Sequence, residues 1–215
     1  MLHDSMYIWL GYLSGSVLYA RIFSRLFQKE NMLEQSKDHN PGTANAFMYG
    51  GFWCGLLTLL FDLGKGFFPV YLFVLYRAAS HPAPFLSALV IAAPVIGHTF
   101  PLFYRFRGGK GIAVTFGCLL GLYPVLHPLF ILAFCFIFFS SILKVSPHFY
   151  RTIFSYACSL VIMIREIDTD AVVLGFFLIS TAVLIKMLTS KEERDKLEVK
   201  LLGRTNPFLR DRRRT

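Results

Sequence analysis

The sequence predicts an all-α membrane protein that crosses the bilayer about seven times, and two observations support this prediction. Hydrophobic residues make up 55% of the chain, charged residues only 16%, and the mean hydropathy is +0.54, values far from those of an average soluble domain. The apolar residues also fall into runs that are too many and too long for a single buried core. Together they favour a polytopic helical protein.

Each apolar run approaches the roughly 17 to 25 mostly apolar residues that a spanning helix needs. The runs lie at about 5–27, 48–77, 84–104, 111–125, 127–143, 148–164 and 171–188. The fourth run is short, so we expect a partial or tilted span there. The N-terminus lacks the basic start and cleavage site of a signal peptide. We therefore expect one domain over 1–215, with 189–215 as a basic cytoplasmic tail.

The distribution of basic residues predicts the topology, because Lys and Arg in short connections stay on the cytoplasmic side. With the N-terminus outside, the outer connections keep only Arg77 and Arg165. The inner connections then collect Arg21, Arg25, Lys29, Lys37, Arg105, Arg107, Lys110, Lys144, Arg151 and the basic residues from Lys186 to Arg214. This pattern favours seven spans over six, with a cytoplasmic C-terminus. It also indicates that the net charge of +9 serves to bind anionic lipid headgroups instead of nucleic acid.

The four cysteines lie in apolar segments and lack the spacing of a metal site. They are Cys54, Cys118, Cys135 and Cys158. We expect them to be buried thiols that behave as small hydrophobic side chains.

A glycine-rich basic stretch, GHTFPLFYRFRGGKGIAVTFG, interrupts the apolar sequence between Gly97 and Gly117. Successive glycines let backbone N–H groups converge on an oxyanion, and nearby cations add fixed charge. It is no Walker A motif, because G-x-x-x-x-G-K-[ST] does not occur. Either a phosphate site or a flexible turn with cations at the membrane edge fits the pattern. The candidate ligands are Arg107, Gly108, Gly109, Lys110 and Gly111.

Two ionisable residues fall inside an apolar run, where a functional role is the default hypothesis. Asp62 and Lys65, in FDLGKGFFP, are three positions apart on one helical face and are expected to pair. The pair either braces the helices or presents Lys65 as a second cation for a phosphate. Gly64 and Gly66 suggest that the helix breaks here and opens its backbone toward a cavity.

Other polar residues give weaker signals, and each has an ordinary structural explanation. His98 suits a membrane boundary, Ser14 and Ser16 can bond back to their own helix, and Asn40 and Asn45 flank a Pro-Gly turn.

The order of these segments along the chain resembles the bacterial acyl-phosphate:glycerol-3-phosphate acyltransferases, a family of small seven-span membrane enzymes. The resemblance covers most of the chain and rests on S-G-S from Ser14, N-P-G-T-A-N from Asn40, D-L-G-K-G from Asp62 and G-H-T-F-P-L-F-Y-R-F-R-G-G-K-G from Gly97. The last string is the most specific of the four.

The resemblance implies a multi-pass protein of the bacterial inner membrane that acts in phospholipid biosynthesis. It implies transfer of a fatty acyl group from acyl phosphate to glycerol 3-phosphate, giving lysophosphatidic acid and inorganic phosphate. No metal and no other cofactor is expected. The implied catalytic residues are Ser16, His98 and Lys110. The implied substrate-binding residues are Asn40, Asn45, Lys65, Arg107, Gly108, Gly109 and Gly111.

The chemistry that the resemblance implies is undemanding, because the acyl phosphate is an activated anhydride. Positioning and stabilisation of the leaving charge can suffice without a protein nucleophile. We expect a substrate phosphate oxygen to accept the proton, with His98 as the second candidate.

The sequence also departs from the family pattern in its first loop and at its C-terminal end. Glu34 and Met48 stand where the family usually has arginine, and Leu18 replaces a proline. The Gly-Ser-Gly before Asn40 is replaced by Lys37, Asp38 and His39. At the end, Lys186 and Met187 lead into a tail that lacks the family's His and Asn and suggests a charged helix with a Glu192–Lys196 pair.

These departures leave two classes of function open. The chain is either an acyltransferase, with glycerol 3-phosphate or a changed acceptor, or a catalytically weakened relative that binds an anionic lipid or acyl phosphate.

Overall fold

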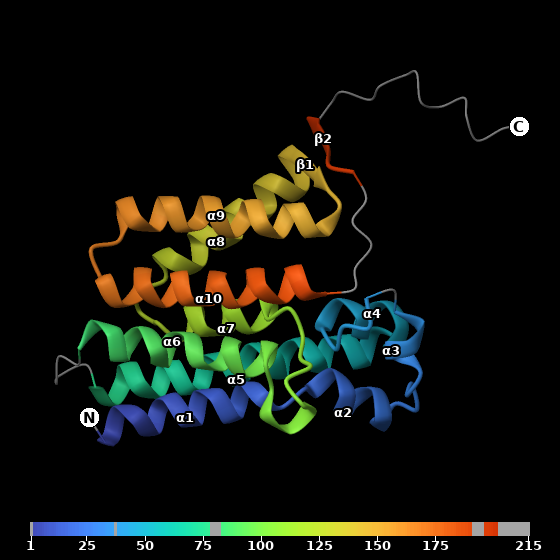
Figure 1. Ribbon diagram of the computed structural model, residues 1–215, viewed down its shortest axis with the longest axis horizontal. Helices are drawn as coiled ribbons and strands as arrows, with labels where there is room; N and C mark the ends of the chain where they lie inside the picture. The colour runs from blue at the N-terminus through green and yellow to red at the C-terminus, as the bar shows by residue number, and fades with distance from the viewer. Residues whose placement is uncertain (1, 37, 78–82, 191–195, 202–215) are drawn as a thin grey trace, which may run out of the picture.

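The computed structural model describes residues 2–36, 38–77, 83–190 and 196–201 of the chain. Helices dominate these residues (Figure 1), which confirms the predicted helical class. The α-helices are α1 (Leu2–Ser16), α2 (Tyr19–Leu26), α3 (Met32–Gln35), α4 (Thr43–Gly50), α5 (Phe52–Arg77), α6 (Pro84–Thr99), α7 (Ile112–Leu120), α8 (His127–Ile137), α9 (His148–Glu166) and α10 (Asp170–Thr189). The described residues also include a 3-10 turn at Leu102–Tyr104 and a π-helical turn at Phe138–Ile142. Two short strands are present, β1 (Leu143–Ser146) and β2 (Glu198–Leu201).

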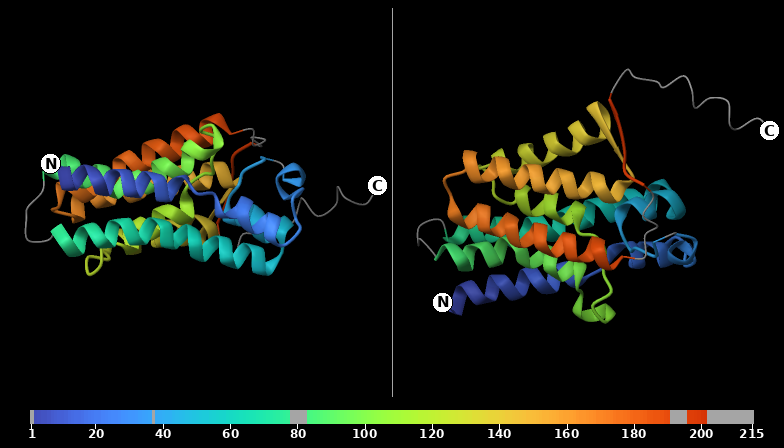
Figure 2. Two further views of the ribbon diagram at one scale, coloured as in Figure 1. Left: turned by 90° about the horizontal axis from the view of Figure 1, so that it is seen from below. Right: turned by 45° about the horizontal axis from the view of Figure 1, so that its top comes forward.

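Each of the seven apolar runs contains one main helix, in turn α1, α5, α6, α7, α8, α9 and α10, and successive main helices run in opposite directions (Figures 1 and 2). In the described part of the chain, three helical segments are long and apolar enough to cross a membrane: Phe52–Tyr76, Pro84–Tyr104 and Asp170–Thr189. His127–Ile142 is a shorter apolar helix, and α7 is short, as its run suggests. The small helices α2, α3 and α4 gather at one end of the molecule, where the connection between α6 and α7 also lies.

The first apolar run does not form one helix, in contrast to the predicted span at 5–27. α1 ends at Ser16 and α2 begins at Tyr19, with the fully buried Leu18 in extended backbone between them. The break leaves the Val17 carbonyl oxygen outside a helical ladder, and the Lys65 ammonium donates to it at 2.7 Å. A buried cation needs such acceptors, and this contact explains why the helix stops here.

The expected break of the helix around Lys65 is wrong, because α5 runs unbroken through Gly64 and Gly66. Gly66 serves packing instead: a methyl group at this position would lie 2.5 Å from the Val114 carbonyl oxygen of α7. From the other side, a methyl group at Gly117 would overlap the Leu63 carbonyl oxygen. The two glycines therefore allow the α5 and α7 backbones to approach closely, as small residues do between membrane helices.

Two other boundaries differ from the sequence prediction. The run at 48–77 is divided at Gly51, whose φ of 88° suits glycine and separates α4 from α5. The tail shows a strand where a charged helix was expected: β2 pairs antiparallel with β1, with Val199 opposite Val145. Lys196 precedes this strand in irregular backbone, and Glu192 lies outside the described residues.

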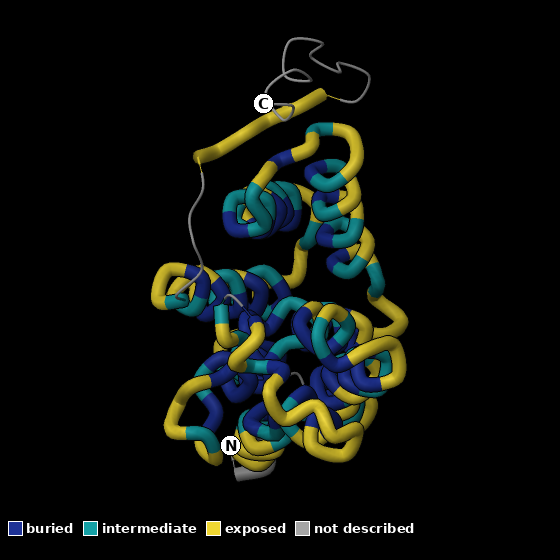
Figure 3. Tube along the Cα trace, turned by 90° about the vertical axis from the view of Figure 1, so that its right-hand side faces the viewer, coloured by how far each residue is buried: buried dark blue, intermediate teal, exposed yellow. Residues whose placement is uncertain are grey.

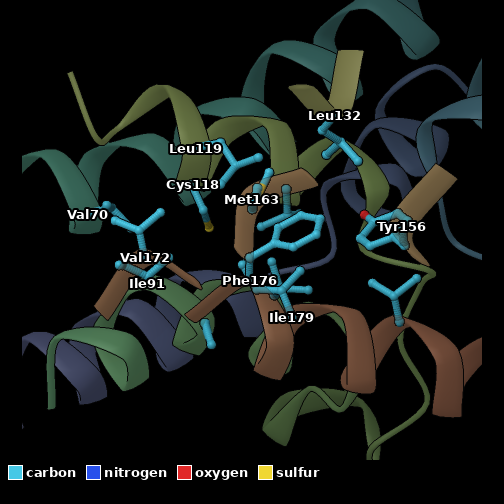
Figure 4. Close-up of a cluster of buried hydrophobic side chains, with 14 of the residues drawn as sticks. Val70, Ile91, Cys118, Leu119, Leu132, Tyr156, Met163, Val172, Phe176 and Ile179 are labelled. Atoms are coloured by element: carbon cyan, nitrogen blue, oxygen red, sulfur yellow. The ribbon is translucent and has the colours of Figure 1, made fainter. Parts of the chain in front are cut away.

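The main core lies where α5, α6, α7, α8, α9 and α10 meet (Figure 4). Val70, Cys118, Phe176 and Ile179 are among its buried members. The hydroxyl group of Tyr156, which also lies in this core, donates a hydrogen bond to Thr115 Oγ1 at 2.9 Å. A buried hydroxyl with a partner does not destabilise the core.

Of the cysteines, Cys54, Cys118 and Cys135 are buried and Cys158 is half-buried, and none forms a disulfide. This confirms the expected buried thiols for three of the four.

Large apolar side chains also cover much of the outer surface of the main helices, as expected where lipid is the solvent. Figure 3 shows exposed and buried stretches alternating along the same helices. The exposed aromatic side chains include Trp9, Phe52, Trp53, Phe68, Tyr76, Phe130, Phe134 and Phe177. So many exposed large apolar residues are not compatible with a monomer surrounded only by water.

Candidate active site

A buried ionic network centred on Lys65 ties three parts of the bundle together. The Lys65 ammonium lies 2.7 Å from Asp62 Oδ1, 2.7 Å from the Val17 carbonyl oxygen and 2.8 Å from His98 Nδ1. All three of its donors are thus used, within α5, on the α1–α2 break and on α6. Thr43 at the start of α4 adds a hydrogen bond to Asp62 Oδ2 at 3.3 Å. The predicted Asp62–Lys65 pair is therefore formed, and it braces the helices.

The network fixes the tautomer of His98, a residue that is only 2% exposed. An ammonium group can only donate, so Nδ1 of His98 accepts from Lys65 and the ring proton lies on Nε2. The basic nitrogen of His98 is therefore already engaged.

The glycines of the central loop wrap around this histidine. A methyl group at Gly108 would overlap the His98 carbonyl oxygen, and one at Gly109 would overlap Nε2 of the ring. The Gly109 N–H donates to the same His98 carbonyl oxygen at 3.1 Å. Gly111, with φ 80°, ends the loop immediately before α7 begins at Ile112. The pair Gly108–Gly109 is thus needed for close packing on His98, and the Gly109 N–H is committed within the protein.

Lys110 turns inward from this loop and meets the first loop. Its ammonium lies 2.9 Å from Asp38 Oδ2, and both side chains are largely buried. Asn45 Nδ2 donates to Asp38 Oδ1 at 2.8 Å, and the Asn40 backbone N–H donates to the same oxygen at 3.2 Å. Burial favours the protonated acid, but the hydrogen bonds from Asn45 and Lys110 outweigh it and hold the pKa of Asp38 below its usual value.

The structure thus brings Asn40, Asn45 and Lys110 together, as expected of residues that bind one ligand. Asn45 also donates to the Asn40 carbonyl oxygen at 2.8 Å. The buried Asn40 Oδ1 has no hydrogen-bond donor within the described part of the chain. Such an acceptor suits a hydroxyl group of a ligand, because burying it unpaired destabilises the protein.

Sequence reasoning did not identify Asp38 as the centre of this group. The N-P-G turn that follows Asp38 could have pointed to it. An aspartate before a turn commonly accepts a hydrogen bond from the backbone N–H two residues further on.

Ser14 and Ser16 do not point into either cluster. Ser16 Oγ donates back to the Tyr12 carbonyl oxygen at 2.8 Å and accepts the Leu102 N–H at 3.3 Å. Ser14 Oγ donates to the Lys65 carbonyl oxygen at 3.2 Å. Ser16 therefore anchors the connection after α6, and Ser14 joins α1 to α5.

Arg107 lies apart from Lys110 although only three positions separate them. The turn just before Arg107 places Arg105 and Phe106 in left-handed backbone, and Arg107 is exposed, whereas Lys110 is buried. The central string therefore presents one cation inward and two on its surface.

Among the described positions that depart from the family pattern, Asp38 belongs to one of the clusters, whereas Glu34 and Met48 lie on the surface. Glu34 is exposed on α3, and Met48 is 68% exposed on α4. Lys186 is half-buried at the end of α10, next to the buried Met187. Lys37 lies outside the described residues.

An apolar groove of about 430 Å³ lies against the Lys65 network. Its walls come from α1, α5 and the start of α2, and they are mostly aliphatic and aromatic. The lining residues are Leu10, Ser14, Tyr19, Leu60, Phe61, Gly64, Lys65, Phe68, Pro69 and Leu72. Lys65 is the charged residue among them, so the groove is apolar along most of its walls and has one cationic side chain.

A helical bundle with an apolar outer surface and an apolar groove defines an integral membrane protein. Its sequence agrees: residues 5–196 match the model of the glycerol-3-phosphate acyltransferase family. The chain belongs to this family.

Relatives and solved structures agree with this assignment. Glycerol-3-phosphate acyltransferases of Pasteurella multocida and Actinobacillus pleuropneumoniae (serotype 5b) are 42% and 44% identical over 113 and 115 residues, covering 53% and 54% of this chain. That of Legionella pneumophila is 40% identical over 119 residues, covering 55% of this chain and 41% of the relative. The chain spans about half the length of the curated relatives it matches, 54% and 56% for the first two.

The fold resembles that of crystal structures of PlsY (YgiH), an integral membrane glycerol 3-phosphate acyltransferase. The TM-scores are 0.71 for its glycerol 3-phosphate form and 0.70 for its lysophosphatidic acid form, at 21% and 20% identity. In both cases the match covers 90% of this chain and 96% of the solved chain.

Proposed function

We propose that this chain is a membrane acyltransferase that moves a fatty acyl group from acyl phosphate to the 1-hydroxyl group of glycerol 3-phosphate, giving lysophosphatidic acid. The observation that carries the proposal is an apolar groove against Lys65, in a protein that also buries Lys110 beside Asn40 and Asn45. Both substrates carry phosphate, and one also carries a long apolar chain. The names of the relatives support glycerol 3-phosphate as the acceptor of the acyl group.

In this proposal the groove between α1 and α5 takes the acyl chain, and the carbonyl end lies toward Lys65. The mostly apolar walls of the groove suit a hydrocarbon chain, because ligand sites are lined by apolar groups with few polar ones. Lys110 and Asn45 hold a substrate phosphate, and Asn40 Oδ1 accepts from a hydroxyl group of glycerol 3-phosphate. Lys65 uses its three donors within the protein, so it chiefly positions His98 and the α1–α2 break.

The reaction forms one bond and breaks one. The 1-hydroxyl oxygen of glycerol 3-phosphate attacks the acyl carbonyl carbon, and a new ester C–O bond forms. The bond between that carbon and the phosphate oxygen breaks, and the phosphate leaves with the electron pair. The hydroxyl proton passes to a phosphate oxygen. Buried donors such as Lys110 lower the barrier by stabilising charge on the leaving phosphate.

The tautomer of His98 supports a phosphate oxygen as the proton acceptor. Nδ1 accepts from Lys65, and Nε2 already carries a proton. His98 is thus better suited to donate a hydrogen bond from Nε2 than to act as a base.

The proposed topology has seven spans in the bacterial plasma membrane, with the N-terminus outside and the C-terminus cytoplasmic. The alternating direction of the main helices supports it (Figure 1). So does the position of the basic segments: the end of α2, the connection after α6, β1 and the end of α10 all lie at one end of the bundle. The clusters then face the cytoplasm, where both phosphorylated substrates are made.

Transfer by purified protein tests the function. The protein in lipid, supplied with palmitoyl phosphate and labelled glycerol 3-phosphate, should release lysophosphatidic acid and inorganic phosphate in equal amounts. Lys110→Ala should lower kcat/KM by about 10- to 100-fold, the value of one charge-assisted contact to phosphate. Lys144→Ala, which removes an exposed cation from β1, serves as the control and should retain activity. Binding of palmitoyl phosphate without transfer to any polyol phosphate would instead establish a binding protein.

A further inference from the structure

Asp38 makes the contacts that a bound phosphate would make. Its two carboxylate oxygens accept from Lys110 Nζ at 2.9 Å, from Asn45 Nδ2 at 2.8 Å and from the Asn40 N–H at 3.2 Å. Lys110 and Asn45 are also the donors that the proposed function assigns to a substrate phosphate. A carboxylate is planar and a phosphate is tetrahedral, but both present anionic oxygens that accept charge-assisted hydrogen bonds from such donors.

We propose that Asp38 is an internal competitor of phosphate: a phosphorylated substrate binds Lys110 and Asn45 by displacing the Asp38 carboxylate, and Asp38 thereby sets how tightly the site holds phosphate. The inference rests on the proposed function in one respect, the assignment of Lys110 as a phosphate ligand. It adds a residue that determines affinity without itself binding substrate.

The position of Asp38 in the fold permits this exchange. It lies in the connection between α3, which ends at Gln35, and α4, which begins at Thr43, so no helical ladder fixes its backbone. Its residue is half-buried, whereas Lys110 is buried. Release would return the carboxylate toward water, where it is well solvated, while Lys110 would keep an anionic partner throughout. The exchange thus leaves no buried charge unpaired.

Competition also explains how the site can release its product. A buried ammonium with amide donors beside it would hold inorganic phosphate tightly after each turnover. A carboxylate that returns to the same donors weakens the apparent affinity for phosphate. Phosphate can then bind only to the fraction of molecules in which the donors are accessible. Removing its charge should therefore tighten phosphate binding and strengthen product inhibition.

The test measures binding of inorganic phosphate to the full chain in detergent by calorimetry. Asp38→Asn keeps the size of the side chain and removes its charge, and Asp38→Ser removes the contacts by shortening it. Both variants should bind phosphate on the order of tenfold more tightly than the unaltered protein, a change equal to about one charge-assisted contact. Inhibition of transfer by phosphate should strengthen by a similar factor.

Glu30→Gln is the matched control, because it removes a carboxylate of the same region that is exposed. It should change phosphate affinity less than twofold, which separates displacement from a general effect of net charge. Unchanged or weaker phosphate binding in both Asp38 variants would overturn the proposal and make Asp38 a positioning residue for Lys110. Failure of both variants to fold would also overturn it, since a side chain that substrate displaces is not indispensable to the fold.

The two proposals fail in different ways. Absence of transfer in the unaltered protein would refute the acyltransferase function, whereas the binding measurement on Asp38 needs no turnover. Tighter phosphate binding in the variants, without transfer in any protein, would sustain the competitor and reject the enzyme.

Discussion

At the scale of single residues, Lys65 shows how a charge is accommodated inside an apolar bundle. The ammonium has three acceptors from different segments, and removing one of them leaves a buried charge with too few partners. Removing a charged partner is the severest case, because the desolvated ion then has no counterion.

We therefore expect Asp62→Asn to destabilise the protein by about 3 to 5 kcal/mol, the usual result of leaving one member of a buried ion pair alone. The double variant Asp62→Asn with Lys65→Met should regain much of that stability, because it removes both charges. Thermal unfolding in detergent measures both. If the double variant were as unstable as the single one, the pair would not be the source of the effect.

The pH dependence of stability should report Asp38. Its pKa is held below the usual value by Asn45 and Lys110, so its carboxylate stabilises the folded state above the pKa of an unfolded aspartate, near pH 4. That contribution is lost as the pH falls through the lower pKa of the folded state. The difference in melting temperature between the unaltered protein and Asp38→Asn should stay constant from pH 5 to 8 and change only below about pH 4. A change near neutral pH would contradict this assignment.

The sequence singled out several polar residues that the structure brings together, but it did not predict most of their partners. Asp62 and Lys65 were predicted to pair because local spacing along a helix decides that contact. The contacts of Asp38 with Lys110, and of Lys65 with His98 and Val17, join distant segments, and no local pattern contains them. Ser16 was predicted to be catalytic but bonds to its own helix and to the Leu102 N–H, an alternative that the sequence had left open.

At the scale of elements, glycines determine how closely the helices pack. Gly66 and Gly117 face backbone oxygens across the α5–α7 contact, and Gly15 and Gly97 do the same between α1 and α6. Without side chains between them, the backbones approach closely and gain dispersion contacts. The groove and the Lys65 network depend on this spacing of α1, α5, α6 and α7.

Gly64 and Gly66 flank Lys65 and provide a matched comparison. Gly66→Ala should destabilise the protein by about 1 to 3 kcal/mol through overpacking, because the new methyl group would lie 2.5 Å from the Val114 carbonyl oxygen. Gly64→Ala should be tolerated, because its methyl group would meet the Phe68 ring at 3.5 Å, an ordinary contact. Melting temperatures of the two variants decide this, and equal destabilisation would count against the packing role of Gly66.

The helical class was predictable because long apolar runs leave few alternatives to a helix in lipid. The ends of the helices were less predictable. The break at Leu18 depends on a lysine far along the chain, and the β1–β2 pairing joins segments more than fifty residues apart. The helix predicted for the tail followed from local charge spacing, which tertiary pairing overrides.

At the scale of the whole molecule, the charge asymmetry and the helix directions make one prediction about orientation. Reporter fusions should place the N-terminus outside and the C-terminus in the cytoplasm, because the basic segments gather at the end of the bundle that holds the two clusters. A fusion at the connection between α9 and α10 should report the outer side and serves as an internal control. A cytoplasmic N-terminus would separate the clusters from cytoplasmic metabolites and overturn the proposed orientation.

The groove between α1 and α5 has a consequence for how the rate of this protein should be measured. Its walls include Leu10, Phe61 and Phe68, which are exposed on helices with apolar outer faces, so under the proposed function the hydrocarbon chain would enter from the lipid side. The relevant concentration of the acyl donor is then its number per unit area of bilayer. Diluting acyl phosphate with inert lipid at constant total amount should slow transfer, while adding buffer should leave the rate per vesicle unchanged at saturating glycerol 3-phosphate.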